Sequence, residues 1–260
     1  MALPKLYKAF YEERVFSFPD VLKKFQEKNY SELYLRKRIN DLIKAGYLGS
    51  VGARGIYYII PQGITKESFV PDKYLIASKL LKTGIIGYHS ALELHGVSYS
   101  NYNTLYVITK SYFRSFEFQE TKYQAVSGVT DFGIEMKQSG GIKIPITDRE
   151  RTIIEGVDKL QYVGGLEEYF KSVELFPSVN FGFLFLYLEK FNKNILYAKI
   201  GFLLSYYKRR WGFPIEYKKK LKAHLGKRVN YLSDKKEKTK LVPEWRLMVP
   251  IRLKNLLEEH

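Results

Sequence analysis

The side chains in this sequence best suited to chemistry are hydrogen-bond donors gathered between residues 31 and 44. Arginine and lysine can donate to guanine O6 and N7, asparagine can pair with adenine through two bonds, and all three can contact phosphate. A serine and a tyrosine stand beside them, and a further arginine follows ten residues later. Together they predict a surface for double-stranded DNA. The predicted DNA-binding residues are Ser31, Tyr34, Arg36, Lys37, Arg38, Asn40, Lys44 and Arg54.

Most of these residues fall within a segment, residues 31–45, that has the pattern of an amphipathic helix. At about 100° per residue, Leu35, Ile39 and Leu42 lie on one side and form an apolar stripe. Ser31 is suited to cap the first turn, because its hydroxyl can accept a bond from an otherwise unpaired N–H. The polar side would face outward, as in a recognition helix. If this side does not bind DNA, its charges only keep an exposed face solvated.

Short segments around this helix complete the pattern of a winged helix-turn-helix. Gly46 suits the left-handed end of a helix, and the two runs after it are rich in β-branched and aromatic residues. These runs predict a hairpin whose tip carries Arg54 between two glycines, in reach of a phosphate or the minor groove. The other expected helices span residues 3–12 and 19–25, and the expected strands span residues 48–51 and 56–60.

A second and larger group of cations lies late in the sequence. The net charge is +16; residues 1–60 hold eleven Lys and Arg against six Asp and Glu, whereas residues 206–240 hold thirteen against three. Aromatic residues are interleaved with these cations, and such a surface can neutralise phosphates and stack on bases. The alternative is a solvated helix end followed by a mobile Lys-rich loop from Asp234 to Lys240. The predicted second anion-binding surface consists of Lys208, Arg209, Arg210, Lys218, Lys219 and Lys220.

Composition limits the class of protein. The chain has no cysteine, which excludes disulfides and thiolate zinc sites and indicates a reducing compartment. No stretch near the N-terminus has the basic-then-apolar order of a signal peptide. The longest apolar run, residues 181–188, is far shorter than the roughly 20 residues that a membrane-spanning helix needs. We therefore expect a soluble, cytoplasmic protein with no membrane partner.

The order of the segments predicts an α+β fold. A stretch containing two prolines and a glycine, Pro61 to Pro71, suits a linker, so we expect a winged helix-turn-helix domain at residues 1–62 and an α+β domain at residues 72–260. In the second domain a small β-sheet should precede a C-terminal helical bundle, and a last strand at residues 245–251 should return to the sheet. The expected strands span residues 105–109, 113–118, 123–126, 134–138 and 142–144, and the expected helices span residues 73–82, 90–95, 147–157, 165–173, 181–191, 195–210 and 215–225.

The segment Thr147-Asp-Arg-Glu has the pattern of a capping box, with Thr147 as the N-cap and Glu150 three residues later. Asp148 and Glu150 also suit the positive end of a helix, and Arg151 is free to reach back to a carboxylate. This pattern favours a structural role over a catalytic one.

One further group has the residue types of a metal-dependent nuclease. Asp131, Glu135 and Lys137 could supply two carboxylates for Mg²⁺ and a lysine to support the attacking water. The first acid, however, is unusually close to the Glu-x-Lys element, and acid and base alternating along an exposed strand explain the pattern. The four histidines do not have metal-ligand spacing. We expect no catalytic residue, no metal site and no cofactor.

Several segments, in this order and spacing, resemble the AbiEi family, the antitoxin half of the type IV abortive-infection toxin–antitoxin pair. The resemblance covers about residues 10–200. The segments are Tyr88-His-Ser-Ala-Leu-Glu-Leu-His-Gly-Val, Thr104-Leu-Tyr-Val-Ile-Thr, Ile146-Thr-Asp-Arg-Glu-Arg-Thr-Ile-Ile-Glu-Gly and Gly164-Gly-Leu-Glu-Glu-Tyr.

This resemblance implies an N-terminal winged helix that binds an operator and represses its own operon. It implies a C-terminal domain that counteracts a nucleotidyltransferase toxin, without necessarily binding it tightly. The expected partners are thus operator DNA and such a toxin, with a homodimer on a repeated operator. Two alternatives stay open: a metal-dependent nuclease acting on DNA or RNA, and a plain transcription regulator whose C-terminal domain senses a ligand or forms a dimer.

Overall fold

The computed structural model describes residues 4–233 and 237–253 and has the expected α+β fold. The chain divides into two compact units, and each unit is assembled from several stretches of sequence. The first comprises Met1–Ile86, Asn103–Thr130 and Met136–Ile146, and the second comprises Gly87–Tyr102, Asp131–Glu135 and Thr147–His260. Residues 1–62 therefore share a compact unit with later strands, although the sequence suggested a boundary after residue 62.

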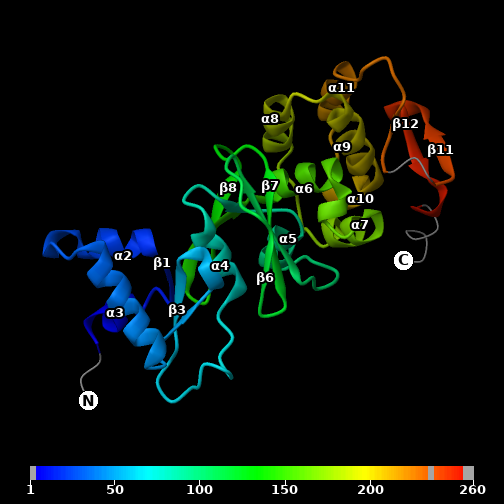
Figure 1. Ribbon diagram of the computed structural model, residues 1–260. Helices are drawn as coiled ribbons and strands as arrows, with labels where there is room; N and C mark the ends of the chain where they lie inside the picture. The colour runs from blue at the N-terminus through cyan, green and yellow to red at the C-terminus, as the bar shows by residue number, and fades with distance from the viewer. Residues whose placement is uncertain (1–3, 234–236, 254–260) are drawn as a thin grey trace. The chain divides into compact units, whose positions relative to one another are not determined.

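The first unit opens with helices and a small antiparallel sheet of order β1-β3-β2 (Figure 1). The expected hairpin is present, but its tip is a turn of 3₁₀ helix. The first expected helix is shorter than residues 3–12, and the strand that follows it was not predicted. The elements are α1 (Lys5–Phe10), β1 (Val15–Ser17), α2 (Phe18–Phe25), η1 (Gln26–Lys28), α3 (Glu32–Lys44), β2 (Leu48–Ser50), η2 (Gly52–Arg54) and β3 (Ile56–Ile59).

Helix α3 forms where its pattern predicted, because one face is buried and both ends are capped. Leu35, Ile39 and Leu42 lie in an aromatic-rich core that also contains the helices and strands before and after them. The Ser31 hydroxyl accepts a bond from the backbone N–H of the third helical residue, and Gly46 has a φ of +76° just past the C-terminal end. The orientation of α3 is thus fixed by burial of its apolar stripe.

A six-stranded mixed sheet follows, with the order β6-β7-β5-β4-β9-β8. Strands β5 and β7 are parallel over six residues, so each of them is longer than its apolar run suggested. Helix α4 (Lys73–Leu80) contacts β1 and β3 within the first unit. The strands are β4 (Ile85–Ile86), β5 (Thr104–Thr109), β6 (Phe116–Phe118), β7 (Thr121–Ser127), β8 (Ile134–Ser139) and β9 (Ile142–Thr147).

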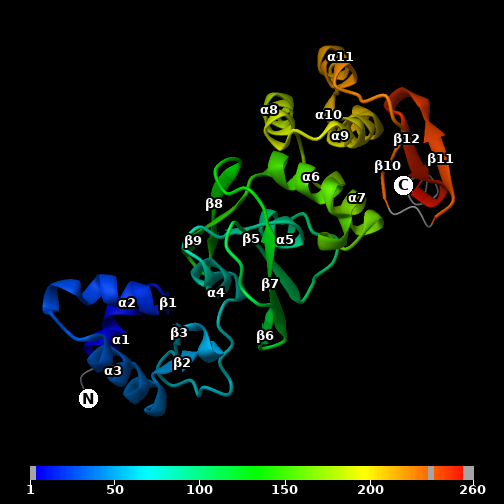
Figure 2. The ribbon, with the colours of Figure 1, turned by 45° about the horizontal axis from the view of Figure 1, so that its top comes forward.

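The second unit is mostly helical and ends in a separate three-stranded sheet (Figure 2). The helix expected over residues 195–210 is divided into α9 and α10. No helix in the described residues is long and apolar enough to span a bilayer. The helices are α5 (His89–His95), α6 (Arg149–Asp158), η3 (Leu160–Tyr162), α7 (Leu166–Glu174), α8 (Phe181–Phe191), α9 (Asn194–Tyr206), α10 (Lys208–Trp211), α11 (Ile215–Ala223) and η4 (Pro243–Trp245).

Two local predictions for this unit were wrong. Asp148, and not Thr147, caps α6, because the Asp148 carboxylate accepts a bond from the Arg151 backbone N–H. The Thr147 hydroxyl instead bonds that of Thr152. The run at residues 245–251 does not return to the six-stranded sheet. It forms β12 (Leu247–Pro250), which pairs with β10 (Asn230–Tyr231) and β11 (Thr239–Val242).

Trp245 anchors this small sheet to α9. The indole is fully buried, and its N–H donates to the Ser205 hydroxyl at 3.0 Å. The ring lies against Gly201, where a Cβ atom would overlap it. A glycine inside a helix costs about 0.5–1 kcal/mol relative to alanine. Here the glycine is required by the close approach of the ring.

We expect Gly201→Ala to lower the free energy of unfolding by about 1–3 kcal/mol, because the added methyl group overpacks the contact with Trp245. In a Trp245→Leu background the same change should cost less, since the indole is gone. Urea unfolding of the wild type, both single variants and the double variant measures this coupling. If Gly201→Ala lowered the free energy of unfolding equally in both backgrounds, the Trp245 ring would not pack against Gly201.

Candidate nucleic-acid interface

The polar side of α3 is exposed along its whole length. Every residue that the sequence assigned to DNA binding on or beside this helix is exposed in the structure. Three of them, Lys37, Asn40 and Lys44, lie within a stripe about 60° wide, directly opposite the buried Leu35 and Leu42. Within the described part of the chain, no hydrogen bond or ion pair occupies these three side chains. Their donors are available to a ligand.

The two arginines beside this stripe are held close to the protein surface. The Arg36 guanidinium lies 3.8 Å from the centre of the Phe18 ring and 3.9 Å from the Glu32 carboxylate. Arg38 lies 3.5 Å from the Asp41 carboxylate. Exposed ion pairs of this kind contribute little to stability, so both arginines can exchange their carboxylate partners for a phosphate at small cost.

Ser31 and Tyr34 start the helix and lie at its exposed end. Because the Ser31 oxygen accepts the capping bond, the proton of its hydroxyl remains able to donate to a phosphate. The Tyr34 ring is half exposed and packs against Tyr30, with ring centres 4.9 Å apart. The same end carries Leu33, which is 80% exposed and which the search for polar groups missed. Its direction on the helix, within about 40° of that of Lys37, is the signal that could have found it.

Arg54 does not extend freely from the hairpin tip. Its Nη2 atom donates to the Arg114 carbonyl at 2.9 Å, and its guanidinium lies 4.4 Å from the centre of the Phe116 ring. These contacts lie inside the first unit and join the hairpin to the start of β6. No local sequence pattern could predict them, because about sixty residues separate the partners.

Asp20 fixes the beginning of α2 and connects it to α4. Its carboxylate accepts bonds from the backbone N–H and hydroxyl of Ser17 and lies 3.0 Å from the Lys79 ammonium. Burial alone would raise the pKa of Asp20, but the bonds from Ser17 and Lys79 outweigh it and hold the pKa below its usual value. The ionised carboxylate is therefore part of the folded structure that joins α2 to α4.

The second basic group is partly neutralised by its own unit. Lys218 pairs with Glu244 at 2.8 Å, Arg210 donates to the Phe176 carbonyl, and Lys220 lies over the Tyr217 ring. In the part of the chain that the structure describes, Lys208, Arg209 and Lys219 are exposed, and no hydrogen bond or ion pair holds their side chains. The sequence alternative of a Lys-rich loop over residues 234–240 falls partly outside the described residues, while residues 239–240 belong to β11.

The structure places Asp131 and Glu135, the two acids of the nuclease alternative, in different local environments. Glu135 lies 3.6 Å from His95, whose other ring nitrogen bonds the Thr147 carbonyl, and Asp131 is exposed in the turn before β8. Among the described residues, no group of three or more histidine, aspartate or glutamate side chains could hold a metal ion.

The polar residues that open α6 are bonded to one another and to the backbone. Arg151 is completely buried; it pairs with Glu155 at 3.0 Å and donates to the Phe132 carbonyl. Asp148 accepts a bond from the Tyr187 hydroxyl at 2.7 Å, and Glu150 accepts one from a backbone N–H of the segment before α8. Arg151 thus reaches a carboxylate on its own helix, and the cluster joins α6 to α8.

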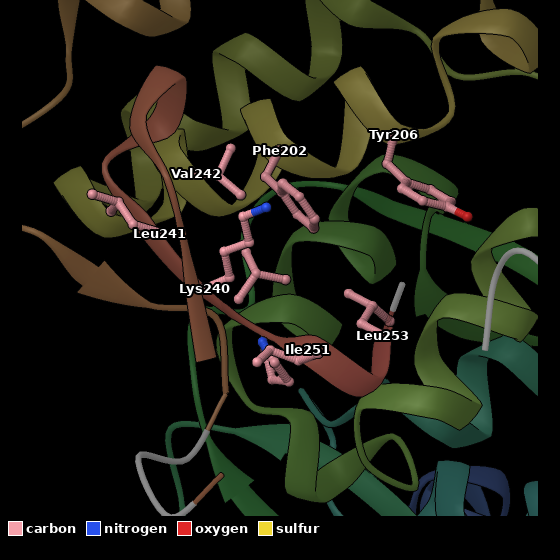
Figure 3. Close-up of a pocket in the computed structure, with 9 residues that line it drawn as sticks. Phe202, Tyr206, Lys240, Leu241, Val242, Ile251 and Leu253 are labelled. Atoms are coloured by element: carbon pink, nitrogen blue, oxygen red, sulfur yellow. The ribbon is translucent and has the colours of Figure 1, made fainter. Parts of the chain in front are cut away.

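An apolar pocket of about 290 Å³ lies between α9 and the C-terminal sheet (Figure 3). Phe202 and Tyr206 line it from α9, and residues of β11, of β12 and of the chain after β12 complete it. Lys240 supplies the one side-chain amine of this lining and Tyr206 its one hydroxyl. The pocket is suited to an apolar group.

Comparison with known proteins adds information on the fold. No family model matches the chain, and no curated protein does. Among solved structures, the chain is similar to the RV2827C protein from Mycobacterium tuberculosis, with a TM-score of 0.60 and 12% sequence identity. The similarity covers 99% of this chain and 95% of that chain. The two proteins thus share a fold over nearly their whole lengths.

We expect the ionised Asp20 to give the first unit a measurable pH dependence. Because its pKa is lowered on folding, its contribution to stability is present above an unfolded pKa of about 3.9 and is lost as the pH falls through the folded value. Asp20→Asn should therefore unfold at lower urea concentration near neutral pH and lose less stability than the wild type between about pH 6 and pH 3.

Urea midpoints measured across this range check the prediction. Lys79→Ala removes one of the partners that lower the pKa and should reproduce part of the change. If the urea midpoints of the wild type and Asp20→Asn changed in parallel with pH, the Asp20 carboxylate would not contribute to the pH dependence of stability.

Proposed function

We propose that this protein is a DNA-binding transcriptional repressor that acts as the antitoxin of a type IV toxin–antitoxin or antiviral defence locus. Residues 1–62 form a winged helix-turn-helix in this proposal, and α3 is its recognition helix. The observation that carries it is the stripe of unoccupied donors, Lys37, Asn40 and Lys44, on the exposed side of a helix whose other side is buried.

The stripe has the chemistry needed to bind duplex DNA. Lys37 and Asn40 suit base edges in the major groove, while Lys44 and the two neighbouring arginines suit the phosphates on either side. Little is lost when the arginines leave Glu32 and Asp41, because both pairs are exposed. Arg54 acts by bracing the hairpin through Arg114 and Phe116, and its contribution to DNA affinity is accordingly smaller than that of Lys37.

The proposed partners are operator DNA and a nucleotidyltransferase toxin. The antitoxin part rests on the resemblance to the AbiEi family, whose most specific segments form α5 and α6 of the second unit. A homodimer on a repeated operator and a cytoplasmic location belong to the same proposal. The free cations Lys208, Arg209 and Lys219 support a second anionic contact made by this unit.

Removal of Lys37 should weaken binding to duplex DNA containing the promoter of the protein's own gene. Lys37→Ala should lower the slope of log K against log salt by about one unit if the ammonium contacts a phosphate. If it contacts a base, the variant should instead bind specific and unrelated duplexes with more similar affinities. Arg54→Ala should change affinity and slope less and should lower the stability of the fold. Fluorescence anisotropy titrations at several salt concentrations measure the DNA affinity of the wild type and of both variants.

Lys66→Ala is the matched control, because it removes one exposed cation that belongs to the same unit but not to α3. It should leave the affinity of the protein for the promoter duplex close to that of the wild type. If Lys37→Ala behaved as Lys66→Ala does in affinity, slope and specificity, α3 would not be the recognition helix.

The antitoxin activity should be separable from operator binding. The test uses the full-length double variant Lys37→Ala/Lys44→Ala, expressed from an unrelated promoter. We expect it to lose operator binding. We expect it still to restore growth to cells that produce the nucleotidyltransferase toxin encoded by the adjacent gene. Growth curves and operator binding by the same variant test this division. A neighbouring gene of another kind, or no rescue by the wild type, would favour a plain transcription regulator.

A further inference from the structure

Leu33 is the one aliphatic side chain of α3 that the fold leaves outside the core. It is 80% exposed, whereas the other leucines of this helix are buried. It is the second residue of the helix, where an acidic side chain would interact favourably with the positive end of the helix dipole. The leucine contributes neither to this end nor to the core, so it is available for a contact outside the chain.

The position of Leu33 relates it to the unoccupied donors. At about 100° per residue, Leu33, Lys37, Asn40 and Lys44 share one stripe and differ in direction by no more than about 60°. Leu33 lies at the N-terminal end of this stripe. In helix-turn-helix proteins, the N-terminal residues of the recognition helix contact the base edges. A side chain that faces the same way as Lys37, one turn earlier, lies against the adjacent bases.

The chemistry of the major groove identifies what a leucine can contact there. Thymine presents a C5-methyl group, whereas the other base edges present donors and acceptors that would lose bonds to water beneath an apolar side chain. We propose that Leu33 is a specificity-determining residue that packs on the methyl group of one thymine, next to the bases faced by Lys37 and Asn40. This inference rests on the proposed function, since it requires α3 to lie in the major groove.

The test uses the full-length protein and duplexes selected by it from a random DNA library. In the selected duplex each thymine is replaced singly by uracil, which removes the methyl group and leaves the Watson–Crick edge unchanged. We expect one position at which uracil weakens binding by the wild type about fourfold, the worth of one buried methyl group. With Leu33→Ala, uracil and thymine at that position should bind nearly equally.

Two controls separate this contact from a change in folding. Leu33→Ala alters an exposed side chain, so its circular dichroism and thermal unfolding should match those of the wild type. Leu186→Ala removes a partly exposed leucine of α8 in the second unit and should keep the fourfold sensitivity to uracil. If only Leu33→Ala loses the difference in affinity between thymine and uracil, Leu33 contacts the thymine methyl group.

The remaining outcomes overturn the inference in distinguishable ways. If the wild type selects a sequence but no uracil weakens binding, or if Leu33→Ala keeps the wild-type sensitivity, Leu33 does not contact a thymine methyl although DNA binding stands. If the wild type selects no sequence and its weak binding does not depend on Lys37, both this inference and the proposed function are wrong.

Discussion

The structure of the surface proposed to bind DNA depends on burial of one side of α3. Leu35, Ile39 and Leu42 are each nearly inaccessible, and burial of such a side chain contributes about 1.5–3 kcal/mol. A rotation of α3 that exposed them would lose this contribution and would place Lys37 and Asn40 in the core without partners. The outward direction of the polar side chains therefore follows from the apolar ones. The donors do not need to be held by hydrogen bonds of their own.

The sequence predicted this helix well because the necessary information is local. The apolar spacing, the Ser31 cap and the glycine at the C-terminal end all lie within sixteen residues, and the structure has each of them. The pattern of the residues also revealed most of the later strands and helices. Their ends were less accurate because pairing, as between β5 and β7, extends strands beyond their apolar runs.

Features that depend on distant contacts could not be predicted in this way. Arg54 looked like a free cation because nothing nearby indicates that the Arg114 carbonyl and the Phe116 ring would hold it. The capping of α6 was displaced by one residue because Thr147 is drawn into β9, which leaves Asp148 at the N-cap. In the second basic group, the partners of Lys218 and Arg210 are likewise remote in sequence. Charge counted along a chain overstates the charge available to a ligand.

The sequence segments of the two compact units alternate along the chain, and this limits how recombination between genes can exchange either unit. The chain passes between the units after Ile86, Tyr102, Thr130, Glu135 and Ile146. A single recombination event between two genes exchanges everything on one side of a breakpoint, so no one breakpoint transfers either unit intact. Under the proposed function, new DNA specificities would arise more readily by point substitutions on the surface of α3 than by exchange of a whole domain.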